Sequence, residues 1–312
     1  MERDRCIDIA KGIAIVAVVF GHCYLFPYTR FIYSWHMPLF FILAGYFFRK
    51  KDVRASLKAD FYRLIVPYLL FGGICCLKFT ATKGIHGEWE TVINTWLGFF
   101  WTNSTKDHTS YLFSWAPGIG AIWFLPALFW CKNIYNWLGN KFVNEKSLYV
   151  MGGAAAIITT LLDVYVVNLP FGILTGSSAM MFYAIGHYSK THKIPVWFVI
   201  IAIACWIFGF NYSHLFMGTC HYGMYPIDVI GACGGTWVIL MLSKGIDKHG
   251  NIFATFLSWM GRYSLVVLCM HYIDVLIDWL CNERIMLEPS ISYYFQTIFT
   301  FPLLVRLKVS LG

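Results

Sequence analysis

Two ionisable side chains, Lys11 and His22, lie eleven positions apart in the first long apolar stretch of the chain. At about 100° per residue, eleven helical steps make three turns and about 20° more, so both side chains would share one helix face, roughly 16 Å apart. A cation on such a face suits an anionic donor, for example a phosphate-bearing coenzyme. An imidazole further along suits removal of a proton from an attacking hydroxyl. The spacing therefore predicts a two-point site for transfer to a hydroxyl.

Asp8 precedes Lys11 by three positions and would pair with it on the same face. A structural alternative remains open for the whole group. In that interpretation Lys11 extends to the lipid headgroups and His22 bonds a neighbouring helix.

Three further ionisable residues are candidates because charged or titratable groups in apolar segments usually face a cavity or a partner. His36 opens the second apolar stretch just before Pro38, which suits a first helical turn, and it would lie near the outer surface within reach of an acceptor. Arg63 precedes the third stretch, where it would bind donor phosphates together with Lys11 or serve only as an anchor. His271 lies deep in a later stretch, and a bond between helices is its structural alternative. A helix-capping or interfacial histidine is the structural alternative for His36.

The composition predicts that a lipid bilayer surrounds these candidates. Of the 312 residues, 58% are hydrophobic and 13% are charged, whereas soluble domains average about 25% charged residues. The formal net charge is +8, but Lys and Arg punctuate the apolar runs, which indicates membrane topology and argues against a nucleic-acid partner. The first apolar run contains Asp8, Lys11 and His22 and lacks a clear cleavage site, so we interpret it as a retained helix.

The apolar stretches predict an all-α, polytopic fold of about ten transmembrane helices in one domain covering residues 1–312. Residues 251–260 are predicted to form a short interfacial helix. For residues 92–102 we favour an amphipathic helix on the outer surface, with an eleventh span as the alternative. The predicted spans are 7–25, 31–48, 64–80, 121–138, 148–167, 172–188, 195–210, 225–243, 262–280 and 290–306.

Cationic residues orient these spans because Lys and Arg are enriched in cytoplasmic loops. With the N-terminus inside, most of them fall on the cytoplasmic side, including Arg49, Lys51 and Lys132, while the outer segments hold only Arg30, Lys83, Lys106 and Arg284. Both termini are therefore predicted to be cytoplasmic. The longest outer loop, 81–120, is rich in aromatic and hydroxyl side chains, which suit either a sugar-binding surface or a lid anchored at the interface.

Known motifs for other chemistries are missing from the sequence. It contains no H-E-x-x-H, no phosphate-binding P-loop and no G-x-G-x-x-G after a strand, so neither a metal hydrolase nor a nucleotide-driven motor has support. We expect no metal.

Several motifs together resemble the acyltransferase-3 family of membrane acyltransferases, in particular the short forms grouped with fucose 4-O-acetylases and polysaccharide O-acetyltransferases. The resemblance runs nearly end to end, and its first two motifs are the most specific. The motifs are Asp8-Ile9-Ala10-Lys11-Gly12 ending at His22, His36-Met37-Pro38-Leu39-Phe40-Phe41 through Gly45-Tyr46, Arg63 through Tyr68, Trp123-Phe124-Leu125, and Ser264 through His271.

The resemblance implies about ten transmembrane helices and an acyl-CoA donor, usually acetyl-CoA, reached from the cytoplasm. It implies a hydroxyl acceptor on a cell-surface carbohydrate or its lipid-linked precursor, and location in the cell (inner) membrane as a multi-pass protein. The family's first-helix motif is a basic residue, ten residues and then His. Lys11 and His22 match that spacing, although Lys replaces the usual Arg and cannot form a two-pronged contact with phosphate.

We therefore expect His22 and His36 to be catalytic, Lys11 and Arg63 to bind the donor, and Asp8, Trp123 and His271 to be substrate-contacting or structural. His22 would act as general base or as a transient acyl carrier. A transporter or exporter of a small polar solute or a polysaccharide is the alternative, although no repeat relates the two halves of the chain. The sequence leaves the oligomeric state, the acceptor sugar and the acyl chain open.

Overall fold

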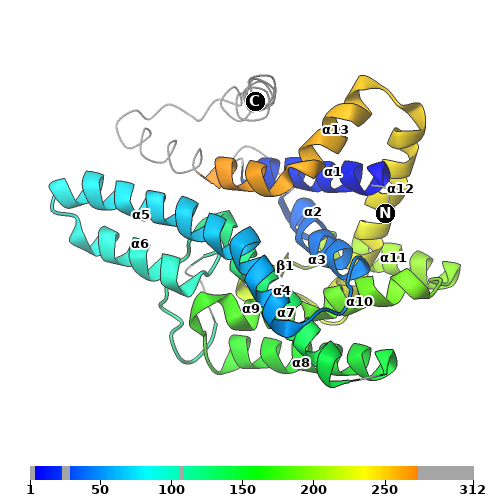
Figure 1. Cartoon of the computed structure of the whole chain (residues 1–312), viewed down its shortest axis with the longest axis horizontal. Coiled ribbons are helices and arrows are strands. Elements are labelled where there is room, and N and C mark those ends of the chain that lie inside the picture. Colours follow the sequence, from blue (N-terminus) through cyan, green and yellow to red (C-terminus); the bar gives the residue numbers. More distant parts are fainter. Residues whose placement is uncertain (1–3, 23–28, 106–108, 143, 273–312) are drawn as a thin grey trace.

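The computed structural model describes residues 4–22, 29–105, 109–142 and 144–272, and these are almost entirely helical (Figure 1). One antiparallel pair of two-residue strands, β1 (Leu215–Phe216) and β2 (His221–Tyr222), is the only sheet among the described residues. The helices are α1 (Arg5–Gly21), α2 (Thr29–Tyr33), α3 (His36–Tyr46), α4 (Val53–Asp60), α5 (Val66–Ile85), α6 (Trp89–Trp101), α7 (Phe124–Lys141), α8 (Glu145–Tyr165), α9 (Ile173–Ser178), α10 (Met180–Thr191), α11 (Val196–Tyr212), α12 (Ile227–His249) and α13 (Ile252–Arg262).

Short helical turns of other types connect these elements. A π-helix, η1 (Phe61–Ile65), joins α4 to α5, and the 3-10 helices are η2 (Gly120–Trp123), η3 (Pro170–Gly172) and η4 (Met217–Thr219). A further helical segment, residues 264–272, follows α13 at an angle of 74°.

Within the described part of the chain, three helices are long and apolar enough to cross a membrane: Val53–Ile85, Glu145–Tyr165 and Ile227–His249. The bent pair formed by α13 and segment 264–272 would be a fourth. The all-α class is thus confirmed and the apolar helices agree with a membrane protein, whereas ten spans and cytoplasmic termini stay predictions. Predicted span 290–306 and the C-terminus lie outside the described residues.

Among the predicted spans whose boundaries differ from the observed helices, two affect candidate site residues. The second is divided into α2 and α3, because the Ser34 hydroxyl donates to the Phe31 carbonyl oxygen at 2.7 Å and so competes with regular helix bonding. The third begins earlier than predicted, since Val53–Ile85 is a continuous helical run of 33 residues that contains η1. The division between α2 and α3 places His36 at the start of α3. The earlier start of the third helical run makes Arg63 part of a helix.

The helices pack closely where glycine removes a side chain. An added Cβ at Gly12 of α1 would lie 2.0 Å from the Leu257 carbonyl oxygen of α13, and one at Gly261 would lie 1.7 Å from the Asp8 carbonyl oxygen. Small residues of this kind let two helix backbones approach one another in membrane proteins. Helix α1 is therefore held directly against α13.

Replacing Gly12 with Ala should lower the melting temperature of the purified protein, because the methyl group collides with a backbone that cannot rotate away. Overpacking of this kind costs about 1–3 kcal/mol. Gly153 of α8 is the matched control, since an added Cβ there meets nothing within 4 Å. Gly153→Ala should leave the melting temperature unchanged or raise it slightly. Equal melting temperatures for the two variants would show that the helix crossing is not close-packed.

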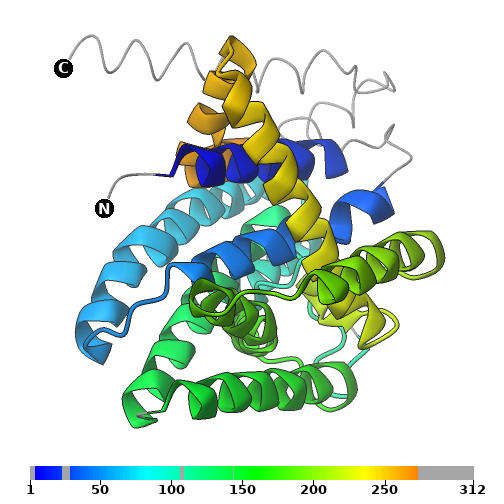
Figure 2. The ribbon, with the colours of Figure 1, turned by 90° about the vertical axis from the view of Figure 1, so that its right-hand side faces the viewer.

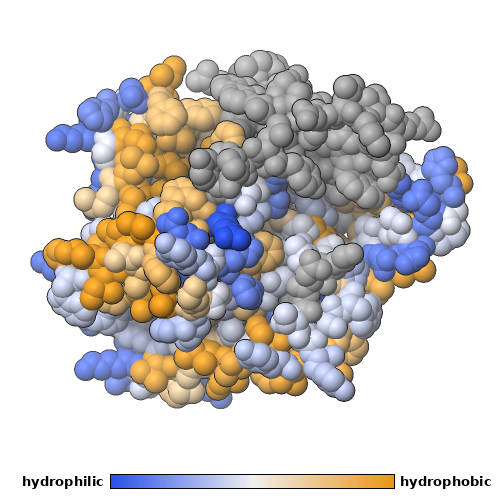
Figure 3. All heavy atoms as spheres, turned by 180° about the vertical axis from the view of Figure 1, so that it is seen from behind, coloured by the Kyte–Doolittle hydropathy of each residue, from blue (hydrophilic) through white to orange (hydrophobic). Residues whose placement is uncertain are grey.

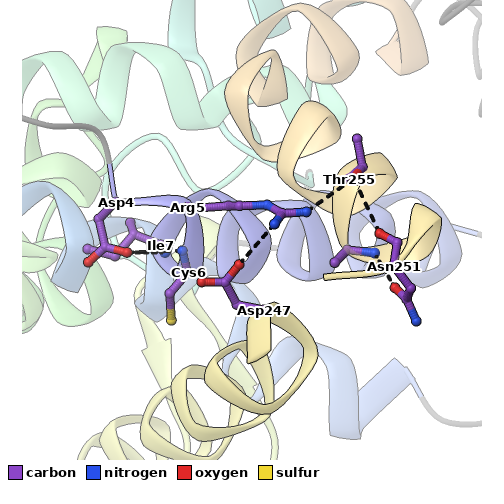
Figure 4. Close-up of polar contacts among 8 residues, drawn as sticks. Asp4, Arg5, Cys6, Ile7, Asp247, Asn251 and Thr255 are labelled. Carbon is purple, nitrogen blue, oxygen red and sulfur yellow. Dashed lines mark hydrogen bonds and ion pairs between the residues drawn. The ribbon is translucent and has the colours of Figure 1, made fainter. Parts of the chain in front are cut away.

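Polar contacts fix the start of α1 to the following helices (Figure 4). The Arg5 guanidinium lies 3.5 Å from the Asp247 carboxylate of α12 and donates to the Thr255 hydroxyl of α13 at 3.1 Å. The Asn251 side chain caps α13 by accepting from the Ala254 amide at 2.9 Å. Figure 2 shows α12 passing beside α1 toward α11. The two contacts of Arg5 therefore join α1, α12 and α13 at this corner.

The surface of the molecule carries many exposed apolar side chains, as a surface that faces a bilayer requires. Figure 3 shows hydrophobic areas over much of one face, interrupted by a compact hydrophilic patch near its middle. Exposed apolar side chains include Leu70, Leu77, Val150 and Ile200, each more than half exposed. Such surface is costly in water.

Candidate functional site

A cavity of about 450 Å³, the first cavity, lies between α1, α3, α7 and the segment that joins α4 to α5. Its wall carries six cationic side chains and one carboxylate, Asp60. Excess positive charge in a concave, partly apolar site favours an anionic ligand. The cationic residues are Lys11, Arg49, Lys51, Arg63, Lys132 and Arg262.

The π-helix η1 positions Arg63 at this cavity. Arg63 lies in the middle of the five-residue turn Phe61–Ile65, which adds one residue per turn and so changes the direction of the side chains. Asp60, directly before the turn, forms an ion pair with Lys132 of α7 and also accepts from the Asn133 amide at 3.4 Å. These contacts hold the turn against α7, so Arg63 is presented from a fixed position.

The connection between α3 and α4 is also anchored to α7. The Asn136 side-chain amide accepts from the Lys51 backbone amide at 3.0 Å and donates to the Lys51 carbonyl oxygen at 3.1 Å. Lys190 of α10 donates to the Phe48 carbonyl oxygen at 3.1 Å. Lys11 lies 5.6 Å from the centre of the Phe47 ring, within the range of a cation–π contact. The cationic wall is therefore supported by several helices.

A second cavity of about 230 Å³ lies at the other end of α1. His22, which caps the C-terminus of α1, and His36 at the start of α3 both line it. The His36 Nδ1 atom lies 2.7 Å from the Ile32 carbonyl oxygen. A carbonyl oxygen only accepts, so Nδ1 carries the hydrogen, and in the neutral ring the lone pair is on Nε2. His36 therefore offers a proton acceptor at a fixed orientation.

Further groups surround these two imidazoles. The ring of His271, fully buried, lies 5.4 Å from that of His22, and the Tyr33 ring lies 5.4 Å from that of His36. The Tyr33 hydroxyl donates to the Gly21 carbonyl oxygen at 3.0 Å, which ties α2 to the end of α1. Hydroxyl groups of Ser104 and Thr105 belong to the same wall. The second cavity thus combines imidazole rings with hydroxyl groups, which are the groups that general-base chemistry on a hydroxyl uses.

The β1–β2 hairpin closes one side of the second cavity with residues 215–218. Ser178 of α9 holds this hairpin, with its hydroxyl 2.8 Å from the Tyr222 hydroxyl and 3.3 Å from the Cys220 sulfur. Outside the hairpin, His214 lies over Phe216 with ring centres 5.8 Å apart. Burial, the charge of His221 and the charge of Arg30 lower the pKa of His214. The hairpin therefore packs best with His214 neutral.

The structure brings most of the predicted site residues together, in two groups. Lys11 and Arg63 line the first cavity, whereas His22, His36 and Trp123 line the second. The shared face predicted for Lys11 and His22 thus opens into a different cavity at each end of α1.

Two predicted candidates lie beside these cavities and line neither. His271 packs behind His22, and Asp8 is buried where α1 crosses α13. Asp8 is therefore placed as a residue of the helix crossing.

Several residues of the two cavities were not identified as site residues from the sequence. The distribution of cations along the sequence accounts for Arg49, Lys51 and Lys132 through membrane topology alone, although Lys132 falls inside a predicted span, where a charge is a functional candidate by default. Arg262 begins predicted span 262–280, a position comparable to that of Arg63, whereas Ser104 and the hairpin have no such signal, because only the fold brings them to the cavities.

Comparison with known proteins identifies the chain's relatives. The sequence profile of a family described as an acyltransferase domain matches residues 4–307. Two curated relatives are the nodulation protein NolL of Mesorhizobium japonicum, 30% identical over 39% of this chain and 35% of its own length, and NolL of Sinorhizobium fredii, 30% identical over 43% of this chain and 38% of its own length. The chain thus matches just over a third of the length of these relatives. No solved structure matches significantly.

Proposed function

This chain belongs to the acyltransferase-3 family, and from that membership we propose that it is a membrane O-acetyltransferase that moves an acetyl group from acetyl-CoA to a carbohydrate hydroxyl. The observation that carries the proposal is the pair of cavities on α1, one cationic and one lined by two imidazoles. The first would bind the phosphates of the donor from the cytoplasm. The second would bind a cell-surface sugar or its lipid-linked precursor.

Lys11 and Arg63 would hold the donor phosphates, as charge-assisted hydrogen bonds favour. Lys11 approaches from α1 and Arg63 from η1, so the two cations reach the first cavity from different helices. Their neighbours Arg49, Lys51 and Arg262 would add to the positive potential. Asp60 is paired with Lys132, so its carboxylate is neutralised where it would otherwise repel phosphate.

His22 would act as the general base of a direct transfer. It takes the proton from the acceptor hydroxyl, whose oxygen attacks the thioester carbonyl carbon; the carbon–sulfur bond then breaks, and the CoA thiolate leaves and takes up a proton. His36, with Nδ1 committed to Ile32, would orient the acceptor through Nε2. His271 would support the His22 ring from behind, and Trp123 would offer the sugar an aromatic face.

The test is release of CoA thiol from acetyl-CoA by the purified protein in lipid bilayers, which counts transfer to any hydroxyl, including water. Methyl fucoside serves as a probe acceptor. We expect thiol release, and we expect CoA to raise the melting temperature because a ligand that binds only the folded state stabilises it. If the protein releases no thiol, the proposal is wrong, and if CoA also fails to stabilise it, transport of a polar solute becomes the better hypothesis.

A further inference from the structure

Three apolar side chains line both cavities: Val18 of α1, Met37 of α3 and Leu268 of segment 264–272. Val18 and Leu268 are almost fully buried, at 3% and 5% exposed, and Met37 packs against the same hydrophobic core. Because each contributes to the wall of both cavities, these three residues lie between the two cavities. We call these three residues the throat.

The three throat residues are apolar, and they separate two polar environments. On one side lie the six cationic residues of the first cavity, and on the other lie His22, His36 and the hydroxyl groups of the second. Hydrophobic constrictions hinder the passage of water and ions. A charged phosphate group or a hydroxylated sugar would lose hydration in the throat without gaining a polar partner there.

The order of residues along α1 defines what must pass through the throat. Lys11 lies in the first cavity, Val18 in the throat and His22 in the second cavity. Helical rise places Lys11 and His22 roughly 16 Å apart along the axis. A donor held at Lys11 by its phosphates therefore reaches His22 only if a long, thin arm joins the phosphates to the acyl group. The pantetheine arm of coenzyme A has this form.

We propose that Val18, Met37 and Leu268 act as positioning residues that admit the thioester end of the pantetheine arm and exclude everything broader. This inference rests on the proposed function and adds a specificity to it: the throat selects acyl groups by width. Straight acyl chains pass and branched ones are retarded, and acyl donors without an arm do not reach His22.

Two isomeric acyl-CoA donors separate the effect of acyl-group width from the effect of acyl-group volume. Butyryl-CoA and isobutyryl-CoA carry the same number of carbon atoms, but only the second is branched next to the carbonyl group. Wild type should release thiol faster from butyryl-CoA. Leu268→Ala should raise the isobutyryl-to-butyryl rate ratio about tenfold, the scale on which a methylene group is discriminated in an apolar site. The ratio does not depend on how much of the variant folds.

The matched control is Leu265→Ala, because Leu265 lies one turn before Leu268 and lines the first cavity without lining the second. Its isobutyryl-to-butyryl ratio should equal that of wild type. A second variant, Val18→Phe, narrows the throat from another helix. It should keep stabilisation by CoA while thiol release from acetyl-CoA falls about tenfold or more.

The outcomes separate the two hypotheses. If wild type releases no thiol from any of these donors, the proposed function is overturned and the throat with it. If wild type is active but Leu268→Ala leaves the isomer ratio unchanged, or Leu265→Ala raises it equally, the throat alone is overturned. If Val18→Phe transfers acetyl groups at the wild-type rate, the throat is again overturned.

Discussion

Replacing His22 with Ala should lower the rate of thiol release from acetyl-CoA in the presence of acceptor by about 10²–10⁴-fold, the usual contribution of a general base. Stabilisation by CoA should stay close to that of wild type, because His22 lines the second cavity and not the first. The two measurements, initial rate and melting temperature with CoA, separate a chemical defect from a binding defect.

His249→Ala is the control for removal of an imidazole, since His249 is exposed at the end of α12 and lines neither cavity. It should behave as wild type. His36→Ala should have a smaller effect than His22→Ala, and mainly raise the KM for the acceptor, because we assign His36 to orientation. Full activity of a folded His22→Ala protein would contradict our assignment of the base.

The helical face that carries Lys11 and His22 could be predicted because it depends only on the period of one helix. The same holds for His36, which begins α3 two residues before Pro38, a residue suited to the first helical turn. Local rules of this kind act over one or two turns. They are independent of how distant segments fold.

The separation of Lys11 and His22 into two cavities could not be predicted in this way. It depends on Met37 and Leu268, which belong to other helices and meet Val18 only in the folded protein. The position of Arg63 likewise depends on a π-turn that is held by an ion pair between residues 72 positions apart. Periodicity and composition contain no information on such contacts.

The cationic residues of the first cavity show where the rule that Lys and Arg are enriched in cytoplasmic loops is incomplete. Excess Lys and Arg near apolar runs is typical of cytoplasmic loops, and that rule accounts for Arg49 and Lys51 without any ligand. The fold gives the same residues a second use, since the first cavity gathers them with Lys132 and Arg262. With the donor bound as proposed, topology and ligand binding would use the same charges on the same side of the membrane.

Removing both Lys11 and Arg63 should abolish measurable stabilisation by CoA, and each single Ala variant should weaken CoA binding about 10- to 100-fold. A hydrogen bond to a charged group contributes about 1.5–3 kcal/mol, and every 1.4 kcal/mol changes an affinity tenfold. The affinity follows from the melting temperature measured over a series of CoA concentrations.

Lys58→Ala is the matched control, because Lys58 lies on α4, five positions before Arg63, and lines neither cavity. It should bind CoA as wild type does. Lys11→Arg should keep or strengthen binding, since a guanidinium contacts phosphate through two parallel hydrogen bonds where an ammonium acts as a point charge. Added salt should weaken the binding of CoA to wild type more than the binding of CoA to the single variants. The variants have fewer charges in the first cavity that salt can screen. If Lys58→Ala weakens binding as much as Arg63→Ala does, general surface charge attracts CoA and the first cavity is not its site.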